Sequence, residues 1–219
     1  MDIFNRLRQW LMKSFFNQLY HSLAWGYDGV AAFVSFGKWH EWGKSVLPFV
    51  KGKSVLELGY GTGHLQKALN EAGFVVFGVD ESWQMARLAR RRVAGGRLIR
   101  GCGQFLPFPG NAFDCVVAVF PAPYLFETAT LAEIQRVLRG DGKLVILPAA
   151  WIVGRGLAGR FWAWIYRITG ESPDLNSEIV AEIAERFSHL GFVIQVTWIE
   201  ENGARLMIVQ GDRNHFVVG

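Results

Sequence analysis

The chain has 219 residues, which suits one domain with a full hydrophobic core and some additional segments. Its net charge of +4 and the lack of a basic run interleaved with aromatics give no argument for nucleic-acid binding. The two cysteines and five histidines are scattered, so we expect neither a disulfide framework nor a metal site. No signal peptide and no apolar run of about 18 residues is recognisable, so we expect a cytoplasmic protein.

Residues 1–50 are expected to form an N-terminal helical extension ahead of a domain that spans 51–219. In residues 2–23 apolar side chains recur at helical spacing, and the opposite face is basic and polar. Such a helix, with Trp and Phe on its apolar face, suits a membrane interface. It equally suits packing on the core as a lid over the site, and the sequence leaves both interpretations open.

From Val55 onward, strand and helix patterns alternate as a doubly wound α/β sheet requires. Ser82 can cap the second helix of this pattern, and residues 139–142 predict a glycine C-cap and turn after the third. The predicted strands cover 54–58, 75–79, 97–100, 112–120 and 143–147, and the predicted helices cover 64–72, 83–93 and 128–138.

An insertion is expected over 148–173, with a helical apolar face and several arginines that again suit a membrane interface or a lid. A helix over 177–190 then precedes two strands, 192–200 and 205–210. Asn202-Gly203 lies between these strands and predicts a hairpin.

The first predicted strand runs into a turn with three glycines, in the stretch Val-Leu-Glu-Leu-Gly-Tyr-Gly-Thr-Gly over residues 55–63. Glycines are needed where the backbone turns sharply and approaches a ligand. A dinucleotide fingerprint reads Gly-x-Gly-x-x-Gly, but here His64 takes the place of the last glycine. Glu57 would repel a pyrophosphate and attract an ammonium group, and Asp80, after the second strand, suits a ribose diol. S-adenosylmethionine has both groups.

Residues 55–63 together with Asp80 closely resemble motif I and the next acidic position of the class I S-adenosylmethionine-dependent methyltransferases. The resemblance spans about 52–211 and implies a Rossmann-like, seven-stranded sheet that ends in an antiparallel hairpin. It also implies S-adenosyl-L-methionine as the cofactor. The candidate cofactor-binding residues are Tyr27, Glu57, Gly59, Tyr60, Gly61, Gly63, Asp80, Glu81, Met85, Gly103, Gln104, Phe105 and Phe120.

Residues 101–108 resemble the family loop Gly-Asp-Ala-x-x-Leu-Pro-Phe, whose acid bonds the adenine amino group. Cys102 replaces that acid here, and a thiol is a poor acceptor, so adenine recognition should fall to the backbone of Gly103 and to Gln104. Two further matches to the family are given structural roles. Asp114 should start a strand, and Glu133 with Arg136 should pair on a helix.

The acceptor should lie over the ends of the fourth and fifth strands, beside residues 120–124. Tyr124 is a candidate polar group near the methyl, and His40 is a candidate base if the N-terminal lid folds over the site. Each could instead be a packing residue, and so could Tyr27, which would otherwise contact the cofactor carboxylate. Phe120 stands where an amino-methylating enzyme has an amide, which argues against a DNA methylase.

We therefore expect a methyltransferase that acts on a small, hydrophobic acceptor such as a quinone precursor or a lipid, with membrane-peripheral contact. Two alternatives stay open. One is a nicotinamide-dependent oxidoreductase, and the other is a non-catalytic S-adenosylmethionine-binding protein. The sequence does not fix the acceptor atom or the oligomeric state.

Overall fold

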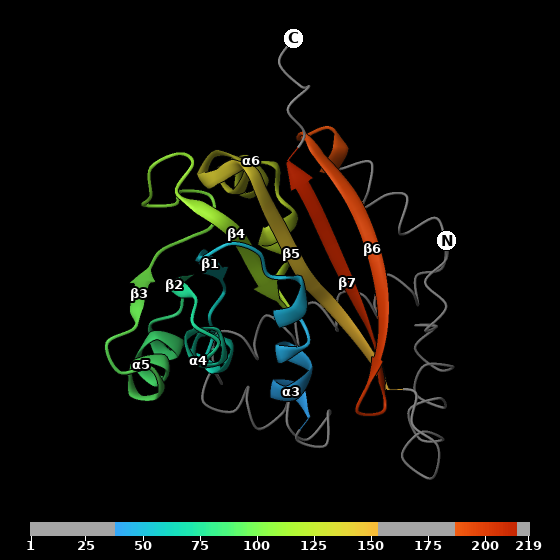
Figure 1. Cartoon of the computed structure of the whole chain (residues 1–219). Coiled ribbons are helices and arrows are strands. Elements are labelled where there is room, and N and C mark those ends of the chain that lie inside the picture. Colours follow the sequence, from blue (N-terminus) through green and yellow to red (C-terminus); the bar gives the residue numbers. More distant parts are fainter. Residues whose placement is uncertain (1–37, 153–186, 214–219) are drawn as a thin grey trace, which may run out of the picture. The chain divides into compact units, whose positions relative to one another are not determined.

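The computed structural model describes residues 38–152 and 187–213, which build one seven-stranded sheet in the order β3-β2-β1-β4-β5-β7-β6 (Figure 1). The strands β3, β2, β1, β4 and β5 are parallel, and β7 pairs antiparallel with both β5 and β6. The predicted doubly wound sheet with a C-terminal antiparallel hairpin is confirmed. The strands are β1 (Ser54–Leu58), β2 (Val75–Asp80), β3 (Arg97–Arg100), β4 (Phe113–Val119), β5 (Leu138–Ile152), β6 (Phe192–Glu201) and β7 (Ala204–Arg213).

Helices cover both faces of the parallel part of the sheet. The helices are α3 (Trp39–Lys44), α4 (His64–Glu71), α5 (Trp83–Arg92) and α6 (Thr128–Val137), with short 3-10 helices η1 (Leu47–Phe49) and η2 (Pro123–Phe126). Side chains alternate between the faces along a strand. Leu56 and Leu58 therefore point to the main core, into which α6 inserts Leu131 and Ile134. On the opposite face, Leu98 of β3 packs against a cluster that includes two alanines of α5.

The predicted starts of α4, α5 and α6 agree with the structure, and for α5 a side-chain cap explains the start. Ser82 caps α5 by accepting a hydrogen bond from the backbone N–H of Met85 at 3.3 Å, as its position before the helix predicts. The hairpin is also confirmed. Asn202 and Gly203 both have positive φ, as a type I′ turn requires, and they join β6 directly to β7.

The prediction for the fifth strand was wrong at both ends. No glycine turn follows α6, because Leu138 is already extended and begins β5. The strand also runs past Leu147 to Ile152, so the first residues of the expected insertion belong to the sheet. At its start β5 pairs with β4, where Leu138 lies opposite Phe113, and beyond Leu147 it pairs with β7 as far as Ile152. These partner strands satisfy backbone groups that the short run alone could not.

Several expected features lie outside the described residues. These are the amphipathic segment 2–23 with Tyr27, the remainder of the 148–173 insertion, and most of the helix expected over 177–190. Within the described ranges, every helix is too short or too polar to cross a membrane.

Candidate functional site

The three glycines after β1 serve different purposes. Gly59, Gly61 and Gly63 all have positive φ, at 74°, 51° and 82°. A Cβ on Gly63 would lie 3.0 Å from the Cβ of Ala89, so this glycine allows α4 and α5 to pack closely. A Cβ on Gly61 would meet nothing within 4 Å. The backbone at Gly61 is therefore open to a ligand, whereas Gly63 serves helix packing.

Asp80 ties the end of β2 to this glycine turn. Its carboxylate accepts one hydrogen bond from the N–H of Gly61 and another from the N–H of Ser82, both at 2.8 Å. Burial raises the pKa of Asp80, and the two backbone donors act in the opposite direction. A carboxylate has about four acceptor positions, so capacity remains for the two hydroxyls of a ribose.

Glu57 is a buried acid with an unsatisfied oxygen. It is 3% exposed, and among the described residues its Oε2 has no hydrogen-bond partner. Burial raises the pKa of Glu57 to about 8, although Gln66 of α4 opposes this with a hydrogen bond. An unpaired buried acceptor is costly, and a cationic amino group would satisfy it. The residues of the site thus fit a ligand with an ammonium and a ribose.

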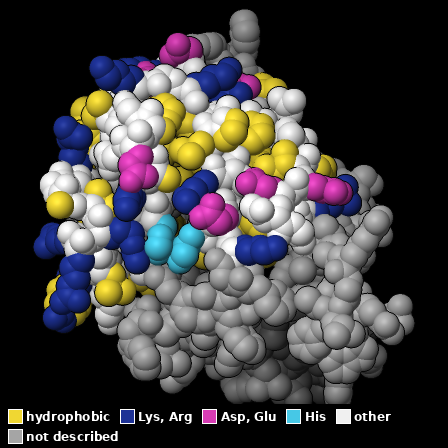
Figure 2. Space-filling view, turned by 60° about the horizontal axis from the view of Figure 1, so that its bottom comes forward, with side chains coloured by type: hydrophobic (Ala, Val, Ile, Leu, Met, Phe, Trp, Pro, Cys, Tyr) yellow, Lys and Arg dark blue, Asp and Glu magenta, His cyan; other side chains and the backbone are white. Residues whose placement is uncertain are grey.

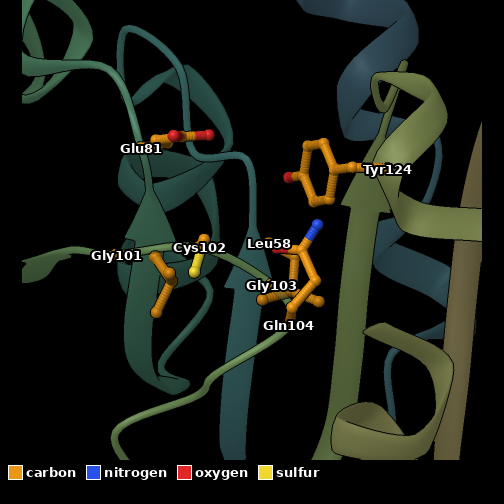
Figure 3. Close-up of a pocket in the computed structure, with 8 residues that line it drawn as sticks. Leu58, Glu81, Gly101, Cys102, Gly103, Gln104 and Tyr124 are labelled. Atoms are coloured by element: carbon orange, nitrogen blue, oxygen red, sulfur yellow. The ribbon is translucent and has the colours of Figure 1, made fainter. Parts of the chain in front are cut away.

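A pocket opens at the carboxyl ends of β1 and β2 (Figure 3). It lies beside the point where the strand order reverses between β1 and β4, which is where open α/β sheets bind ligands. In Figure 3 the Tyr124 hydroxyl points into the pocket and the Glu81 carboxylate points toward it from the opposite side. The lining residues are Leu58, Val79, Glu81, Gly101, Cys102, Gly103, Gln104 and Tyr124.

Tyr124, in η2, spans two glycine-bearing segments of the site. Its hydroxyl lies 3.2 Å from the position of a Cβ on Gly59, and its ring lies 3.0 Å from that of a Cβ on Gly103. The chain enters this region through Phe120, whose φ of 46° is unusual for an aromatic residue. Such backbone strain is typical of functional sites. Side chains at either glycine would displace the tyrosine.

The loop after β3 is held in place by α6. Glu133 accepts a 2.7 Å hydrogen bond from the N–H of Leu106, and Arg136 donates to the carbonyls of Leu106 and Phe108. The Arg136 partner lowers the pKa of Glu133. Both the i,i+3 pair and its structural role agree with the sequence interpretation. These hydrogen bonds from Glu133 and Arg136 fix the loop at residues 106–108 and so position the pocket residues Gly103 and Gln104, which precede them in the loop.

Asp114 also has the structural role expected from the sequence. It lies at the start of β4 and accepts hydrogen bonds from the backbone N–H groups of Lys53 and Ser54, each at 2.8 Å. Asp114 thereby aligns the start of β1 with β4. This pairing sets the register that delivers Glu57 to the site.

The structure separates the predicted site residues into two groups. Those that lie at the pocket or glycine turn are Glu57, Gly59, Gly61, Asp80, Glu81, Gly103, Gln104 and Tyr124. Three others are not among the residues that line the pocket. The Tyr60 side chain is buried against α5, Met85 is buried in that helix, and Phe105 is 80% exposed. Their contact with a cofactor stays a prediction, as does that of Tyr27, which is not described.

Gln104 has a polar contact at the pocket edge. Its Nε2 donates a 2.9 Å hydrogen bond to the carboxylate of Glu127, the residue before α6. Cys102 also lines the pocket. Sequence reasoning did not single out two further lining residues, which are Leu58, the last residue of β1, and Val79, the residue before Asp80 in β2. Their position at the carboxyl ends of the two strands is the signal that could have found them.

His40, in α3, contacts the residue that follows the glycine turn. Its ring stacks on that of His64, the first residue of α4, with centroids 3.3 Å apart. Figure 2 shows a pair of histidine side chains in contact, bordered by basic and acidic side chains. The sequence interpretation did not predict this contact of His64, although its place in the fingerprint was a signal. In the described ranges there is no group of three or more side chains that could hold a metal ion.

The comparisons with known proteins identify a methyltransferase domain. Residues 56–146 match the family described as a methyltransferase domain. A demethylmenaquinone methyltransferase from Symbiobacterium thermophilum is 31% identical over 169 residues, which cover 70% of this chain and 66% of that protein. A ubiquinone/menaquinone biosynthesis C-methyltransferase from Yersinia enterocolitica is 27% identical over 211 residues, which cover 90% of this chain and 82% of that protein.

The fold has solved counterparts. The structure of magnesium protoporphyrin IX methyltransferase from Synechocystis, with bound S-adenosylhomocysteine, aligns with a TM-score of 0.54 at 20% identity. The alignment covers 80% of this chain and 83% of that one, and it shows the shared fold alone. Together with the glycine turn and its two acids, the comparisons establish that this chain belongs to the class I methyltransferases, which use S-adenosyl-L-methionine.

Proposed function

We propose that the protein transfers the methyl group of S-adenosylmethionine to a small hydrophobic acceptor, a quinone precursor of the demethylmenaquinone type. The observation that carries the proposal is the pairing of Glu57 and Asp80 around an open glycine turn. One acid has an unpaired buried oxygen, and the other is already bonded to Gly61. This arrangement suits the amino group and the ribose of the methyl donor.

The remaining pocket residues would hold the adenine end. Gly103 and Gln104 belong to the loop that α6 clamps, and Glu81 faces them across the pocket. When bound, S-adenosylmethionine supplies an electrophilic methyl group on a sulfonium. The protein then has to align the acceptor with that methyl and to exclude water. Buried side chains around the strand ends, such as Leu58 and Val79, serve the exclusion.

An oxygen or carbon acceptor also has to lose a proton near neutral pH. Tyr124 and His40 are the two candidates to accept or relay it. The Tyr124 hydroxyl points into the pocket and lies beside Gly59. This position supports Tyr124 as the group that handles the proton. His40 lies at the other end of the same turn, stacked on His64. We assign Tyr124 to the acceptor side and keep His40 as the residue whose variant decides between the two.

The nature of the acceptor is supported by the relatives and by composition. Two relatives that match this chain are named for demethylmenaquinone and for ubiquinone/menaquinone biosynthesis. The chain is 51% hydrophobic and carries nine tryptophans, which suits an enzyme that handles an apolar ring. The chain spans just under two thirds of the length of the first of these relatives. We therefore propose the same class of acceptor and not the identical molecule.

The test is isotope transfer from methyl-labelled S-adenosylmethionine into a reduced, short-chain demethylmenaquinone. We expect label in the organic extract and a product heavier by one methylene, with less product from Tyr124→Phe. His40→Asn is the matched comparison, because it removes the other candidate base. Label that appears in no quinone, while S-adenosylhomocysteine still binds, would instead support the non-catalytic alternative. Tight binding of a nicotinamide dinucleotide would support the oxidoreductase.

A further inference from the structure

Positive charge is concentrated on α5 and β3. Residues 81–100 contain six arginines and one acid, Glu81. The net charge of this stretch alone therefore exceeds that of the whole chain, which is +4. All six arginines are exposed. Figure 2 shows basic side chains gathered along its left edge, the side on which Figure 1 draws α5 and β3. We call this surface the arginine face: Arg87, Arg90, Arg91, Arg92, Arg97 and Arg100.

The structure does not neutralise this face. None of the ion pairs found within the described ranges includes one of its arginines. Arg87 and Arg97 instead lie over aromatic rings, at 5.7 and 5.3 Å from the ring centroids. Arg92 and Arg100 donate to backbone carbonyls. Six like charges without carboxylate partners repel one another, so the face is suited to an anionic partner.

Two exposed aromatic side chains lie in α5 and in the loop after β3, the two elements that carry the arginine face or directly follow it. Trp83 is 57% exposed and Phe105 is 80% exposed. Trp83 follows the carboxyl end of β2, and Phe105 lies in the loop after the carboxyl end of β3. Because β2 and β3 are neighbouring parallel strands, both aromatics lie at the sheet edge where the cofactor pocket opens. Exposed Trp and Phe beside arginines are typical of surfaces that insert into a lipid headgroup layer.

We propose that the arginine face, with Trp83 and Phe105, docks the protein on the anionic headgroups of a phospholipid membrane. The choice of a lipid surface over a nucleic acid rests partly on the proposed quinone acceptor, which partitions into membranes. It also rests on the placement of the two aromatics, which border the charges rather than alternate with them as base-stacking residues would. Docking in this way brings the open edge of the sheet to the layer that holds the acceptor.

The experiment measures binding of the full chain to vesicles by co-sedimentation. Vesicles of phosphatidylcholine are compared with vesicles that also contain phosphatidylserine. The test variant is Arg90→Gln/Arg91→Gln, since the exposed side chains of these arginines make no hydrogen bond or ion pair with the residues that the structure describes. The matched control is Lys51→Gln/Lys53→Gln, which removes the same charge at the opposite end of the sheet, before β1.

We expect binding that requires phosphatidylserine and weakens as salt is added. The test variant should bind roughly 30-fold more weakly, since each basic residue near an anionic surface contributes about 1 kcal/mol. The control variant should bind like the wild type. Equal losses in both variants, or equal binding to both kinds of vesicle, would overturn the proposal. The proposal would also be overturned if the protein bound an RNA oligonucleotide more tightly than the anionic vesicles and the test variant lost that RNA binding.

Two parallel measurements separate this proposal from the proposed function. S-adenosylhomocysteine binding, measured on both variants, shows that each is folded. Methyl transfer to a detergent-solubilised quinone precursor tests the acceptor without any membrane. If transfer fails while arginine-dependent vesicle binding holds, the acceptor assignment is wrong and the docking surface stands. If transfer succeeds and vesicle binding is absent, the docking proposal is wrong.

Discussion

The carboxylate of Asp80 accepts a 2.8 Å hydrogen bond from the backbone N–H of Gly61. This bond joins the two sequence features from which the cofactor was inferred, the acid after β2 and the glycine turn after β1. The site is therefore organised by its own backbone before any ligand binds, and Asp80 has both a structural and a binding role. Substitution of Asp80 should affect both.

Asp80→Ala should weaken S-adenosylhomocysteine binding by about 1–3 kcal/mol, the usual loss for a charged hydrogen-bonding partner. Isothermal titration calorimetry measures this loss. Asp80→Asn keeps one acceptor oxygen and should fall between the wild type and the alanine variant. Glu71→Ala, on the exposed surface of α4, is the control and should bind normally. Wild-type affinity in Asp80→Ala would refute the ribose assignment.

Glu57 should make the unliganded protein less stable as pH rises. Burial raises its pKa in the folded state to about 8, from 4.5 when unfolded. The folded state therefore binds the extra proton, and the stability it contributes is present below about pH 4.5 and lost as pH approaches 8. Urea denaturation across this range should show Glu57→Gln losing less stability than the wild type. Parallel pH profiles for the two proteins would contradict the prediction.

The same residue should couple ligand binding to proton release. An ammonium placed beside Glu57 favours its ionised form, so binding below about pH 8 should release a proton. Calorimetry near neutral pH, in buffers of different ionisation enthalpy, measures the number released. Glu57→Gln should abolish this buffer dependence and weaken the affinity. Binding without proton exchange in the wild type would mean that the amino group lies elsewhere.

Gly61 and Gly63 should respond differently to alanine. Gly63→Ala combines a positive φ with a close contact to Ala89, so it should destabilise the fold by about 2–4 kcal/mol. Gly61→Ala meets no neighbouring atom, and its stability loss should be limited to about 1–2 kcal/mol from the backbone. Its Cβ would project into the space open to the ligand, so its cofactor affinity should fall more than its stability. Denaturation and calorimetry on both variants give the comparison.

Tyr124→Phe should separate chemistry from binding. The ring, which packs beside Gly103, is kept, and the hydroxyl near Gly59 is removed. If the hydroxyl handles the acceptor proton, kcat should fall by about 100-fold, with little change in KM for S-adenosylmethionine. The pH profile of kcat should also change shape. Gly103→Ala, which crowds the ring from behind, should instead raise KM. An unchanged kcat in Tyr124→Phe would leave the tyrosine as a wall of the pocket.

Sequence alone was sufficient for features that local chemistry decides. The glycine turn, the Ser82 cap and the Asn202-Gly203 hairpin each depend on residues within a few positions of one another. Glycine spacing and capping side chains leave few backbone conformations open, so the pattern is enough. The fold class followed, because alternating strands and helices of this kind have few ways to bury their apolar faces.

The tertiary structure decided everything that depends on residues distant in sequence. The length of β5 depends on β7, which lies some sixty residues later and provides hydrogen bonds beyond Leu147. The stacking of His40 on His64, and the approach of Tyr124 to Gly59, result from elements that meet only in the folded chain. Gly61 and Gly63 look equivalent in the sequence, but only one has Ala89 against it. Long-range contacts depend on the packing of whole faces, which no short stretch of sequence encodes.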